Sequence, residues 1–410
     1  MSTRKLRVGV VGTGRGGVLA NDCKLLKTAV LVAICDNNAE YLTKFKEEFK
    51  DQDISYYDNF DEFIKYDMDC VVLANYAHEH AKFAIKAMEN GKDVISEVLP
   101  CKNLAEAVAL IDCQERTGRN YFYSENYCYM KAPYEMKRKY KSGELGEFEY
   151  GEGEYLHDCE SLWPSITQGN PEHWRNCMSA FFYCTHSAGP LLHITGLRPV
   201  KVMGFENNFN EKMARMGARA GGSAVEIVTL ENGAHFKSLH GVGPSRDSVW
   251  YSVYGSKGRM ESAREGTSRG NYNSVFACLD GATNAEDYYT PIIDDEENAM
   301  QTGHGGGDYY ALKFAFNYLL GDKTADVIDL YEAIDMWLIG HFGYFSCVEQ
   351  RVLDIPNFRD KAVREQYRYD TRSCFAEEEN KEPLVSYLKS EISIDPKIYD
   401  IIKEKFNKKD

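Results

Sequence analysis

Six residues near the N-terminus, GTGRGG at positions 12–17, limit the fold of this chain more than any other stretch. They follow a short apolar run at 6–11 and open a segment at 15–27 that has a helical pattern. A glycine-rich turn between a buried strand and a helix is typical of a dinucleotide-binding βαβ unit. In such a turn Gly12 allows the tight bend, Gly14 leaves room for a pyrophosphate, and Gly17 lets the helix pack closely.

Strands and helices are predicted to alternate over the first 125 residues. Buried strands are expected at 29–35, 70–74, 93–96 and 120–125, and helices at 39–49, 79–90 and 103–117. This alternation predicts a parallel sheet with helices on both faces. Asp36 closes the second strand, where a carboxylate accepts the ribose hydroxyls of NAD and repels the 2′-phosphate of NADP. We therefore expect an NAD-binding Rossmann domain over residues 1–128 of an α/β chain.

The pattern of apolar and polar residues changes after residue 130. Alternating apolar and polar residues predict strands at 147–158, 224–231, 234–242 and 248–256, and helices return at 308–320 and 328–349. The turn ENG at 231–233 indicates a hairpin between two of these strands. We expect an α+β substrate-binding domain over 129–357, built on an antiparallel sheet, and a polar C-terminal extension over 358–410.

Bulk properties exclude several classes of partner. The 410 residues carry a formal charge of −15, which argues against nucleic acid as a partner. We find no apolar run of the roughly 20 residues that a membrane span needs. The 12 cysteines show no regular spacing, and the N-terminal run is too short for a signal peptide, so reduced thiols and a cytoplasmic location are expected.

Two short stretches carry groups suited to proton transfer. The stretch YCTHSAGP at 183–190 contains Tyr183 and His186, and EYLHD at 154–158 contains Tyr155 and His157. Imidazole and phenol groups can serve as general acids and bases. A metal is the competing use, with His157, Cys184 and His186 as its candidate ligands, although their spacing is no metal signature. The third alternative is that these side chains only pack.

The segment at 71–100 brings a family into view. A strand ends, a loop carries a histidine, a helix follows, and a second strand ends in Glu97. Together with the N-terminal fingerprint and the antiparallel second domain, this segment resembles the Gfo/Idh/MocA oxidoreductases. The resemblance implies a C-terminal domain with an open, mostly antiparallel sheet, a sugar or polyol bound between sheet and nicotinamide, and a homo-oligomer formed through that sheet.

The resemblance also implies which residues contact the cofactor. These expected residues are Gly12, Thr13, Gly14, Arg15, Gly16, Gly17, Asp36, Asn75, His80, Glu97 and His304. Of these, His80 is expected to hold the loop after the fourth strand rather than to take part in the chemistry. His304 lies in a glycine-rich segment that could close over the nicotinamide or the sugar, and it could equally belong to a mobile loop.

One departure from the family matters for the chemistry. Glu97 is followed by Val98, Leu99 and Pro100, whereas the family motif is Glu-Lys-Pro. The lysine of that motif favours the alkoxide of the reacting hydroxyl by its charge, which valine cannot do. Another group must therefore act as the base.

A branch without that lysine resembles the chain more closely, namely the NAD-dependent glycosidases typified by glycoside hydrolase family 109. Its motifs are Tyr-Pro-Thr-His-Gly-x-Gly-Pro, Tyr-x-His-Asp and Gly-His-Gly-Gly. This chain matches them in order at 183–190, 155–158 and 303–306, with Cys184 in place of the proline and Ser187 in place of the first glycine. These two changes leave the substrate open.

The resemblance implies a redox-neutral hydrolysis by tightly bound NAD. The sugar C3 is oxidised, the C2 proton is removed, the aglycone leaves C1, water adds and C3 is reduced again. We assign the C3 hydroxyl proton to His186 and the C2 proton to Tyr155, with Tyr183 or His157 in support. A tyrosine can act in this way only when a positive charge lies near it.

Two other functions remain open. A NAD-dependent sugar or cyclitol dehydrogenase would use His186 as its base and release NADH. A regulatory protein could instead sense NAD on the same fold without turnover, although several proton-transfer groups argue against it. A divalent ion is a further cofactor to test.

Overall fold

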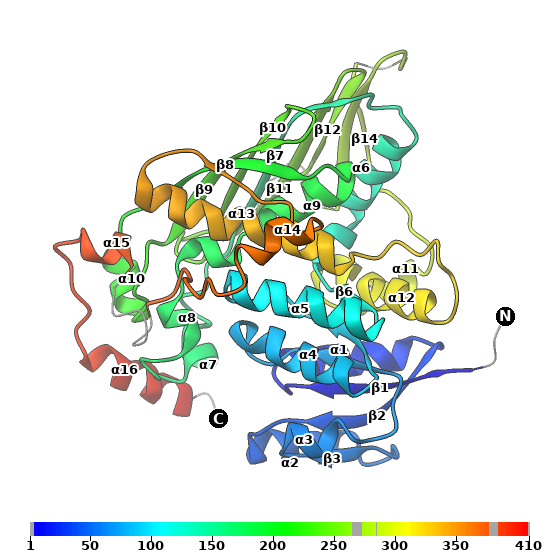
Figure 1. Ribbon diagram of the computed structural model, residues 1–410, viewed down its shortest axis with the longest axis vertical. Helices are drawn as coiled ribbons and strands as arrows, with labels where there is room; N and C mark the ends of the chain where they lie inside the picture. The colour runs from blue at the N-terminus through cyan, green and yellow to red at the C-terminus, as the bar shows by residue number, and fades with distance from the viewer. Residues whose placement is uncertain (1–3, 265–272, 284, 377–383, 409–410) are drawn as a thin grey trace. The chain divides into compact units, whose positions relative to one another are not determined.

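The computed structural model describes residues 4–264, 273–283, 285–376 and 384–408. The chain divides into two compact units (Figure 1). Unit 1 consists of Met1–Lys131, Ile292–Ile334 and Phe358–Thr371. Unit 2 consists of Ala132–Pro291, Asp335–Asn357 and Arg372–Asp410. Each unit is therefore assembled from three segments of the chain.

Unit 1 contains the predicted parallel sheet. Its strands, in the spatial order β3-β2-β1-β4-β5-β6, are β1 (Leu6–Val11), β2 (Ala29–Cys35), β3 (Ser55–Tyr57), β4 (Cys70–Leu73), β5 (Asp93–Ser96) and β6 (Tyr121–Tyr123). All five neighbouring pairs run parallel. This order is that of the doubly wound dinucleotide-binding fold, and it confirms the predicted Rossmann domain. The short strand β3 was not predicted.

In unit 1, as far as the structure describes it, five helices lie in the connections between these strands, and three more come later in the chain. They are α1 (Arg15–Leu25), α2 (Ala39–Glu48), α3 (Phe60–Phe63), α4 (His80–Glu89) and α5 (Leu104–Thr117), followed later in the chain by α11 (Glu296–Ala299), α12 (Gly307–Leu319) and α14 (Lys361–Glu365). Helices α4 and α5 lie side by side (Figure 1). Asn103 caps the start of α5, and Gly118 ends that helix in the left-handed conformation.

The strand register brings the loops of the predicted cofactor site to one edge of the sheet. Backbone hydrogen bonds join Gly12 N to Cys35 O at 2.8 Å, Ala74 N to Val11 O at 2.9 Å, and Glu97 N to Leu73 O at 2.8 Å. Because the carboxyl ends of parallel strands meet at the same edge, the residues that follow β1, β2, β4 and β5 gather there.

Unit 2 is built on a nine-stranded sheet in the order β14-β13-β12-β11-β7-β10-β9-β8-β15. The strands are β7 (Phe148–Leu156), β8 (Pro199–Glu206), β9 (Ser223–Leu230), β10 (His235–Gly241), β11 (Ser248–Gly255), β12 (Gly258–Ser262), β13 (Val275–Leu279), β14 (Asp287–Tyr289) and β15 (Leu353–Asp354). The sheet is antiparallel, as predicted, except that β7 and β10 run parallel. Helices and two strands separate β7 from β10, so the chain can return in the same direction.

The helices of unit 2 include one long helix on the sheet. They are α6 (Lys131–Lys141), α7 (Trp163–Thr167), α8 (Trp174–Cys177), α9 (Thr185–Thr195), α10 (Glu211–Met216), α15 (Val385–Leu388) and α16 (Lys397–Asn407), while α13 spans Leu330–Glu349. Helix α16 buries Ile402 in a cluster with Trp163 and Met213, so this helix packs against α7 and α10. In the part of the chain that the structure describes, no helix has the length and apolarity to cross a membrane.

Candidate active site

The glycine-rich loop forms an anion-binding turn at the start of α1. Gly12 has a φ of 86°, and a Cβ at this position would lie 2.6 Å from the carbonyl oxygen of Ala74. A Cβ at Gly14 would meet no described atom within 4 Å, so this position faces open space. Among the described residues no side chain caps α1, and its first N–H groups are left to bind a phosphate.

The third glycine of the motif acts differently from the expectation. A Cβ at Gly17 would lie 2.3 Å from the ring of Phe45 in α2, so Gly17 makes room for a neighbouring helix. The close approach to the sheet occurs at Gly16, where a Cβ would lie 3.0 Å from a side-chain methyl group of Val10 in β1. The two glycines therefore let α1 approach β1 on one side and α2 on the other, because consecutive helical residues face different neighbours.

Two polar residues at the sheet edge fit the expected nucleotide. The Asp36 carboxylate accepts hydrogen bonds from Thr13 N and Thr13 Oγ1, both at 2.6 Å, and from Asn38 N at 2.8 Å. These bonds fix a carboxylate at the end of β2. Within the described residues, both polar atoms of the buried Asn75 amide have no hydrogen-bond partner. Such an orphaned amide beside an open phosphate cradle is what a bound NAD would complete.

His80 ties two loops together. Its Nδ1 lies 2.8 Å from Leu99 O, and its Nε2 lies 3.1 Å from Asn75 O. The ring is fully buried, and burial lowers the pKa of His80 despite these two carbonyl groups. A neutral ring donates to only one of the two carbonyl groups at a time. This placement matches a role in holding the loops.

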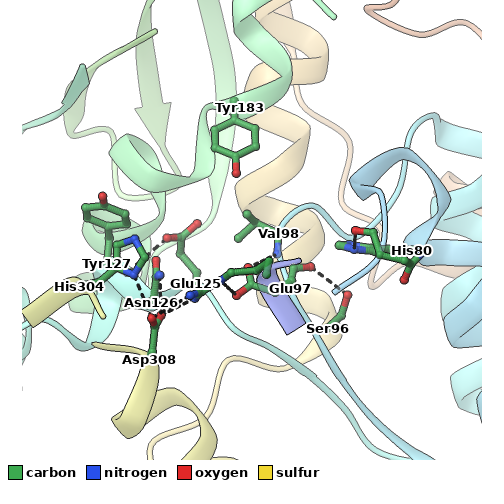
Figure 2. Close-up of polar contacts among 12 residues, drawn as sticks. His80, Ser96, Glu97, Val98, Glu125, Asn126, Tyr127, Tyr183, His304 and Asp308 are labelled. Atoms are coloured by element: carbon green, nitrogen blue, oxygen red, sulfur yellow. Dashed lines mark hydrogen bonds and ion pairs between the residues drawn. The ribbon is translucent and has the colours of Figure 1, made fainter. Parts of the chain in front are cut away.

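Asp308 is the centre of a charged cluster in unit 1, which Figure 2 shows. Arg15, the first residue of α1, donates to Asp308 through Nη1 at 2.9 Å and Nη2 at 2.5 Å, and to Glu97 Oε1 through Nε at 2.8 Å. Asn126 Nδ2 donates to Asp308 Oδ1 at 2.8 Å, and His304 Nδ1 donates to Oδ2 at 3.0 Å. We call Arg15, Asp308 and His304 the Asp308 clasp. It links the glycine-rich loop to the segment before α12.

The clasp is strongly polarised. Burial alone would raise the pKa of Asp308, but His304 and Arg15 outweigh burial and hold that pKa far below its usual range. The pKa of His304 is raised, because its bond to Asp308 outweighs the effect of burial. Asp22 on α1 lies near the same charges, and burial together with Asp308 raises its pKa to about 7.

In unit 2 the structure brings three of the predicted proton-transfer residues together. The ring centroid of His186 lies 4.6 Å from that of Tyr155 and 5.0 Å from that of Tyr183. The two phenol rings lie 6.4 Å apart. His186 is 6% exposed, so its imidazole is largely shielded from bulk water.

A glycine in β7 explains why these rings meet. Helix α9 carries His186 in its first turn and packs on β7, the strand that carries Tyr155. A Cβ at Gly153 would lie only 1.9 Å from the carbonyl oxygen of Ser187. Any larger residue at Gly153 would push α9 away from the sheet. The Tyr251 hydroxyl also donates to His186 O at 2.5 Å and fixes the start of this helix.

Arg175 places a positive charge against Tyr183. Its Nη2 donates to Tyr183 Oη at 3.2 Å, and the guanidinium lies 4.8 Å from the ring centroid of Tyr183 and 4.5 Å from that of Trp174. Burial works against the charge, yet Tyr183 and other neighbours outweigh it, so the pKa of Arg175 is raised. A partly buried positive charge therefore lies beside the Tyr183 hydroxyl.

The remaining candidates have other partners: His157 lies beside Tyr155 and faces the surface, and Cys184 is buried. The His157 ring centroid is 6.1 Å from that of Tyr155, and Nδ1 pairs with Asp247 Oδ1 at 2.9 Å at the surface. Cys184 is buried and donates through Sγ to Met336 O at 3.6 Å. Over the described ranges, no group of three or more histidine, cysteine, aspartate or glutamate side chains is arranged to hold a metal ion.

The structure adds three residues that the sequence analysis missed, namely Arg175, Asp308 and Asn126. Asp308 follows the GHGG segment and stands in the first turn of α12, where an acidic residue is favoured, so a local signal existed. The other two had no local signal. Arg175 is one of 48 basic residues, and only the packing of α8 places it beside Tyr183.

Comparison with known proteins found a family whose model matches the N-terminal part of the chain. Residues 6–125 match the model of the Gfo/Idh/MocA oxidoreductases, described as an oxidoreductase family with an NAD-binding Rossmann fold. A glycosyl hydrolase family 109 protein from Solibacter usitatus is 29% identical over 203 residues, which span 46% of each chain, so less than half of that relative is covered. A glycosyl hydrolase family 109 protein from Bacteroides fragilis is 26% identical over 81% of each chain.

Solved structures agree with the fold. A levoglucosan dehydrogenase in complex with NADH and L-sorbose superposes with a TM-score of 0.72 at 17% identity, covering 87% of this chain and all of the other. At this identity the likeness concerns the fold alone. Residues 6–125 match the NAD-binding Rossmann fold of the Gfo/Idh/MocA oxidoreductase family, and the curated relatives of the chain include glycosyl hydrolase family 109 proteins.

Proposed function

We propose that this protein is a NAD-dependent glycoside hydrolase that works by transient oxidation of its sugar. Relatives named glycosyl hydrolase family 109 support this function, at 26–29% identity. The structure supports it further through His186, which lies against two phenols, and through Arg175, which contacts one of them.

NAD, when bound, supplies the acceptor that takes the hydride from the sugar C3 and later returns it. His186 accepts the proton of the C3 hydroxyl at a ring nitrogen as the hydride leaves. Tyr155 then accepts the C2 proton, which the C3 ketone has made acidic, and the aglycone leaves C1. Water then adds its hydroxyl to C1, and its remaining proton neutralises the aglycone anion that has left. Tyr155 returns a proton to C2 and His186 returns one to the C3 oxygen. The cofactor ends in its starting state, so the net reaction is hydrolysis.

The contact of Arg175 with Tyr183 is the observation that carries the proposal. An oxidation of a hydroxyl needs a single base, and His186 alone would supply it. Removal of the C2 proton needs a second acceptor, for which we propose Tyr155. The Arg175 guanidinium, held on Tyr183, is near enough to Tyr155 to interact with it electrostatically. The sugar or cyclitol dehydrogenase remains the second candidate, since the related solved structures include sugar dehydrogenases. An NAD sensor would need neither base.

The cofactor of the proposed cycle is NAD rather than NADP, and it stays bound between turnovers. The Asp36 carboxylate at the end of β2 supports the preference for NAD, because it would repel a 2′-phosphate. The Asp308 clasp supports retention, because it joins the residue that begins α1 to the segment before α12. A redox-neutral enzyme has no need to exchange its cofactor.

We also propose that copies associate through the face of the unit 2 sheet opposite α9. The strand register places Phe205, Ile227, Tyr150 and Tyr254 on that face, and each is between 38% and 50% exposed. Apolar side chains gathered on an open sheet favour association. All twelve cysteines are free, which is in keeping with a reducing compartment such as the cytoplasm.

A panel of aryl glycosides tests the function directly. The purified protein is incubated, without added NAD, with aryl glycosides that differ in sugar and anomer. Release of the aryl alcohol without net NADH is expected for at least one of them, and the His186→Ala variant is expected to lose it. If no glycoside is cleaved while a free sugar or cyclitol reduces added NAD, the dehydrogenase replaces this proposal.

A further inference from the structure

Four buried polar side chains form a cluster under the start of α9. They are Ser187 of α9, Ser238 and His240 of β10, and Glu226 of β9, and each is 0% exposed. Ser187 Oγ donates to Cys184 O at 2.8 Å and lies 2.8 Å from Ser238 Oγ, which can therefore donate to it. His240 Nδ1 lies 3.3 Å from Ser187 Oγ and 3.3 Å from Glu226 Oε2. We call this set the Ser187 cluster.

The cluster carries no net charge at neutral pH. Glu226 and His240 are close enough to form an ion pair, but burial outweighs their attraction. Burial raises the pKa of Glu226 to about 8 and lowers that of His240 to about 3. At pH 7 the carboxyl is therefore protonated and the imidazole is neutral. Ser187, Ser238 and His240 are within hydrogen-bond distance of one another, whereas neither Glu226 oxygen has a hydrogen-bond partner among the described residues.

The cluster lies directly behind the proposed proton-transfer groups. Ser187 follows His186 in α9, and His240 is the register partner of Tyr155 across the parallel pair of β7 and β10. Ser238 is the register partner of Gly153, the residue that lets α9 approach the sheet. A positive charge on His186 lowers the pKa of His240, so the two imidazoles are within electrostatic reach of each other.

We propose that the Ser187 cluster is a neutral hydrogen-bonded support for His186, and that Ser187 is its positioning residue. The inference rests on the proposed role of His186 and goes beyond it. Ser187 stands where the resembling motif has glycine, and without its hydroxyl Ser238 would lose a hydrogen-bond partner in a site that excludes water. Ser187 Oγ also donates to Cys184 O, and this second bond holds the first turn of α9, which carries His186.

The test compares Ser187→Ala and Ser187→Gly with a matched control. Ser252→Ala removes a hydroxyl that is equally buried on β11 but has no hydrogen-bond partner within the described residues. If Ser187 positions the base, kcat falls by about 10- to 100-fold while KM changes little, because alignment matters most in the transition state. Ser252→Ala is expected to retain the wild-type kcat.

A spectroscopic arm separates this inference from the proposed function. The protein is labelled with 13C-histidine, and the His186 ring signal is assigned by its loss in His186→Asn. Ser187→Ala is expected to move that signal by more than Ser252→Ala does, whether or not any glycoside is cleaved. Ser238→Ala serves if Ser187→Ala does not fold, since it breaks the same hydrogen bond from the sheet. A His186 signal that moves no more than in the control, or a kcat equal to that of the control, overturns the proposal.

Discussion

Two single side chains decide which steps of a sugar reaction this chain can assist. Val98 stands where the related motif has lysine, so no cation from that position stabilises a C3 alkoxide. Arg175 instead places its charge on a phenol, 3.2 Å from Tyr183 Oη. In the proposed cycle this cation therefore supports the tyrosine pair that includes Tyr155, the acceptor of the C2 proton, rather than the C3 alkoxide.

Tyr155→Phe is expected to separate oxidation from cleavage. The variant keeps His186 and so still oxidises C3, but it lacks the group that accepts the C2 proton. Cleavage should fall by about 10²–10⁴-fold, and enzyme-bound NADH should accumulate. The measurement is the near-ultraviolet absorbance of NADH, which NAD lacks. A Tyr155→Phe variant that cleaves at the normal rate, or that forms no NADH, would show that Tyr155 only packs.

Arg175 offers a matched comparison for the same step. Arg175→Met removes the charge but keeps much of the apolar stem, whereas Arg175→Lys keeps the charge. We expect cleavage to fall more than oxidation in Arg175→Met, and Arg175→Lys to lie between that variant and the wild type. Single-turnover measurements of the two steps provide the check.

The buried carboxyl of Glu226 predicts how stability depends on pH. Its pKa rises from 4.5 to about 8 on folding, so between these values the unfolded chain has lost this proton while the folded chain still holds it. Stability therefore falls as pH rises through this window. His240 acts in the opposite sense below pH 6.5, because its folded pKa is lowered to about 3.

Glu226→Gln isolates this effect between pH 6.5 and 8. From the shifted pKa, the wild type should lose about 2 kcal/mol of unfolding free energy relative to the variant over this interval. Denaturant unfolding of both proteins at the two pH values measures the difference. Equal pH slopes for the two proteins would mean that the Glu226 carboxyl is ionised in the folded state.

Most helices and strands of the first 125 residues, β3 and α3 excepted, could be predicted because each obeys a local rule. The apolar runs at 29–35 and 93–96 match β2 and β5, and Asn103 and Gly118 frame α5 as capping residues. The strands β8 and β13 were missed, because pairing with neighbours distant in the sequence decides short strands. The parallel pairing of β7 with β10 could not be predicted for the same reason.

The candidate site also contains some residues that local sequence patterns predict and some contacts that they do not. The glycine-rich loop and the histidine motifs are continuous in the sequence, so their residues could be named in advance. Arg15 with Asp308 spans 293 positions, and Tyr155 meets His186 only because Gly153 lets a helix lie on a strand. Contacts of this kind depend on tertiary packing, and no local pattern encodes them.

The Asp308 clasp predicts slow release of NAD. Asp308→Asn keeps the size of the side chain but removes the charge that Arg15 and His304 share. Charge-assisted hydrogen bonds contribute about 1.5–3 kcal/mol each, so NAD should dissociate at least about tenfold faster from the variant. The measurement follows nucleotide lost during buffer exchange and then released by denaturation.

The control for this prediction is Asp322→Asn, on the loop after α12 and outside the clasp. It should retain NAD as the wild type does. A wild-type protein that is purified without nucleotide, or an Asp308→Asn variant that holds NAD equally long, would contradict retention by the clasp.

At the scale of the whole molecule, the exposed apolar face of the unit 2 sheet predicts that the protein forms an oligomer. Phe205→Glu and Ile227→Lys place charges on that face, and in solution they should reduce the mass toward the 46.7 kDa of one chain. Ile292→Lys, at a 90% exposed residue of unit 1, is the control and should leave the mass unchanged. Light scattering after gel filtration measures the mass. A wild-type protein that is already a monomer would remove the basis for this interface.

The origin of the hydrogen at C2 of the released sugar distinguishes the proposed cycle from direct displacement at C1. If the molecule oxidises C3 before it cleaves C1, the C2 proton leaves with Tyr155 and returns from solvent. Hydrolysis of a cleaved glycoside in heavy water should then place deuterium at C2 of the released sugar, as mass spectrometry and NMR would show. Product with ordinary hydrogen at C2 would mean direct displacement at C1, and it would contradict both the proposed cycle and the roles given to Tyr155 and His186.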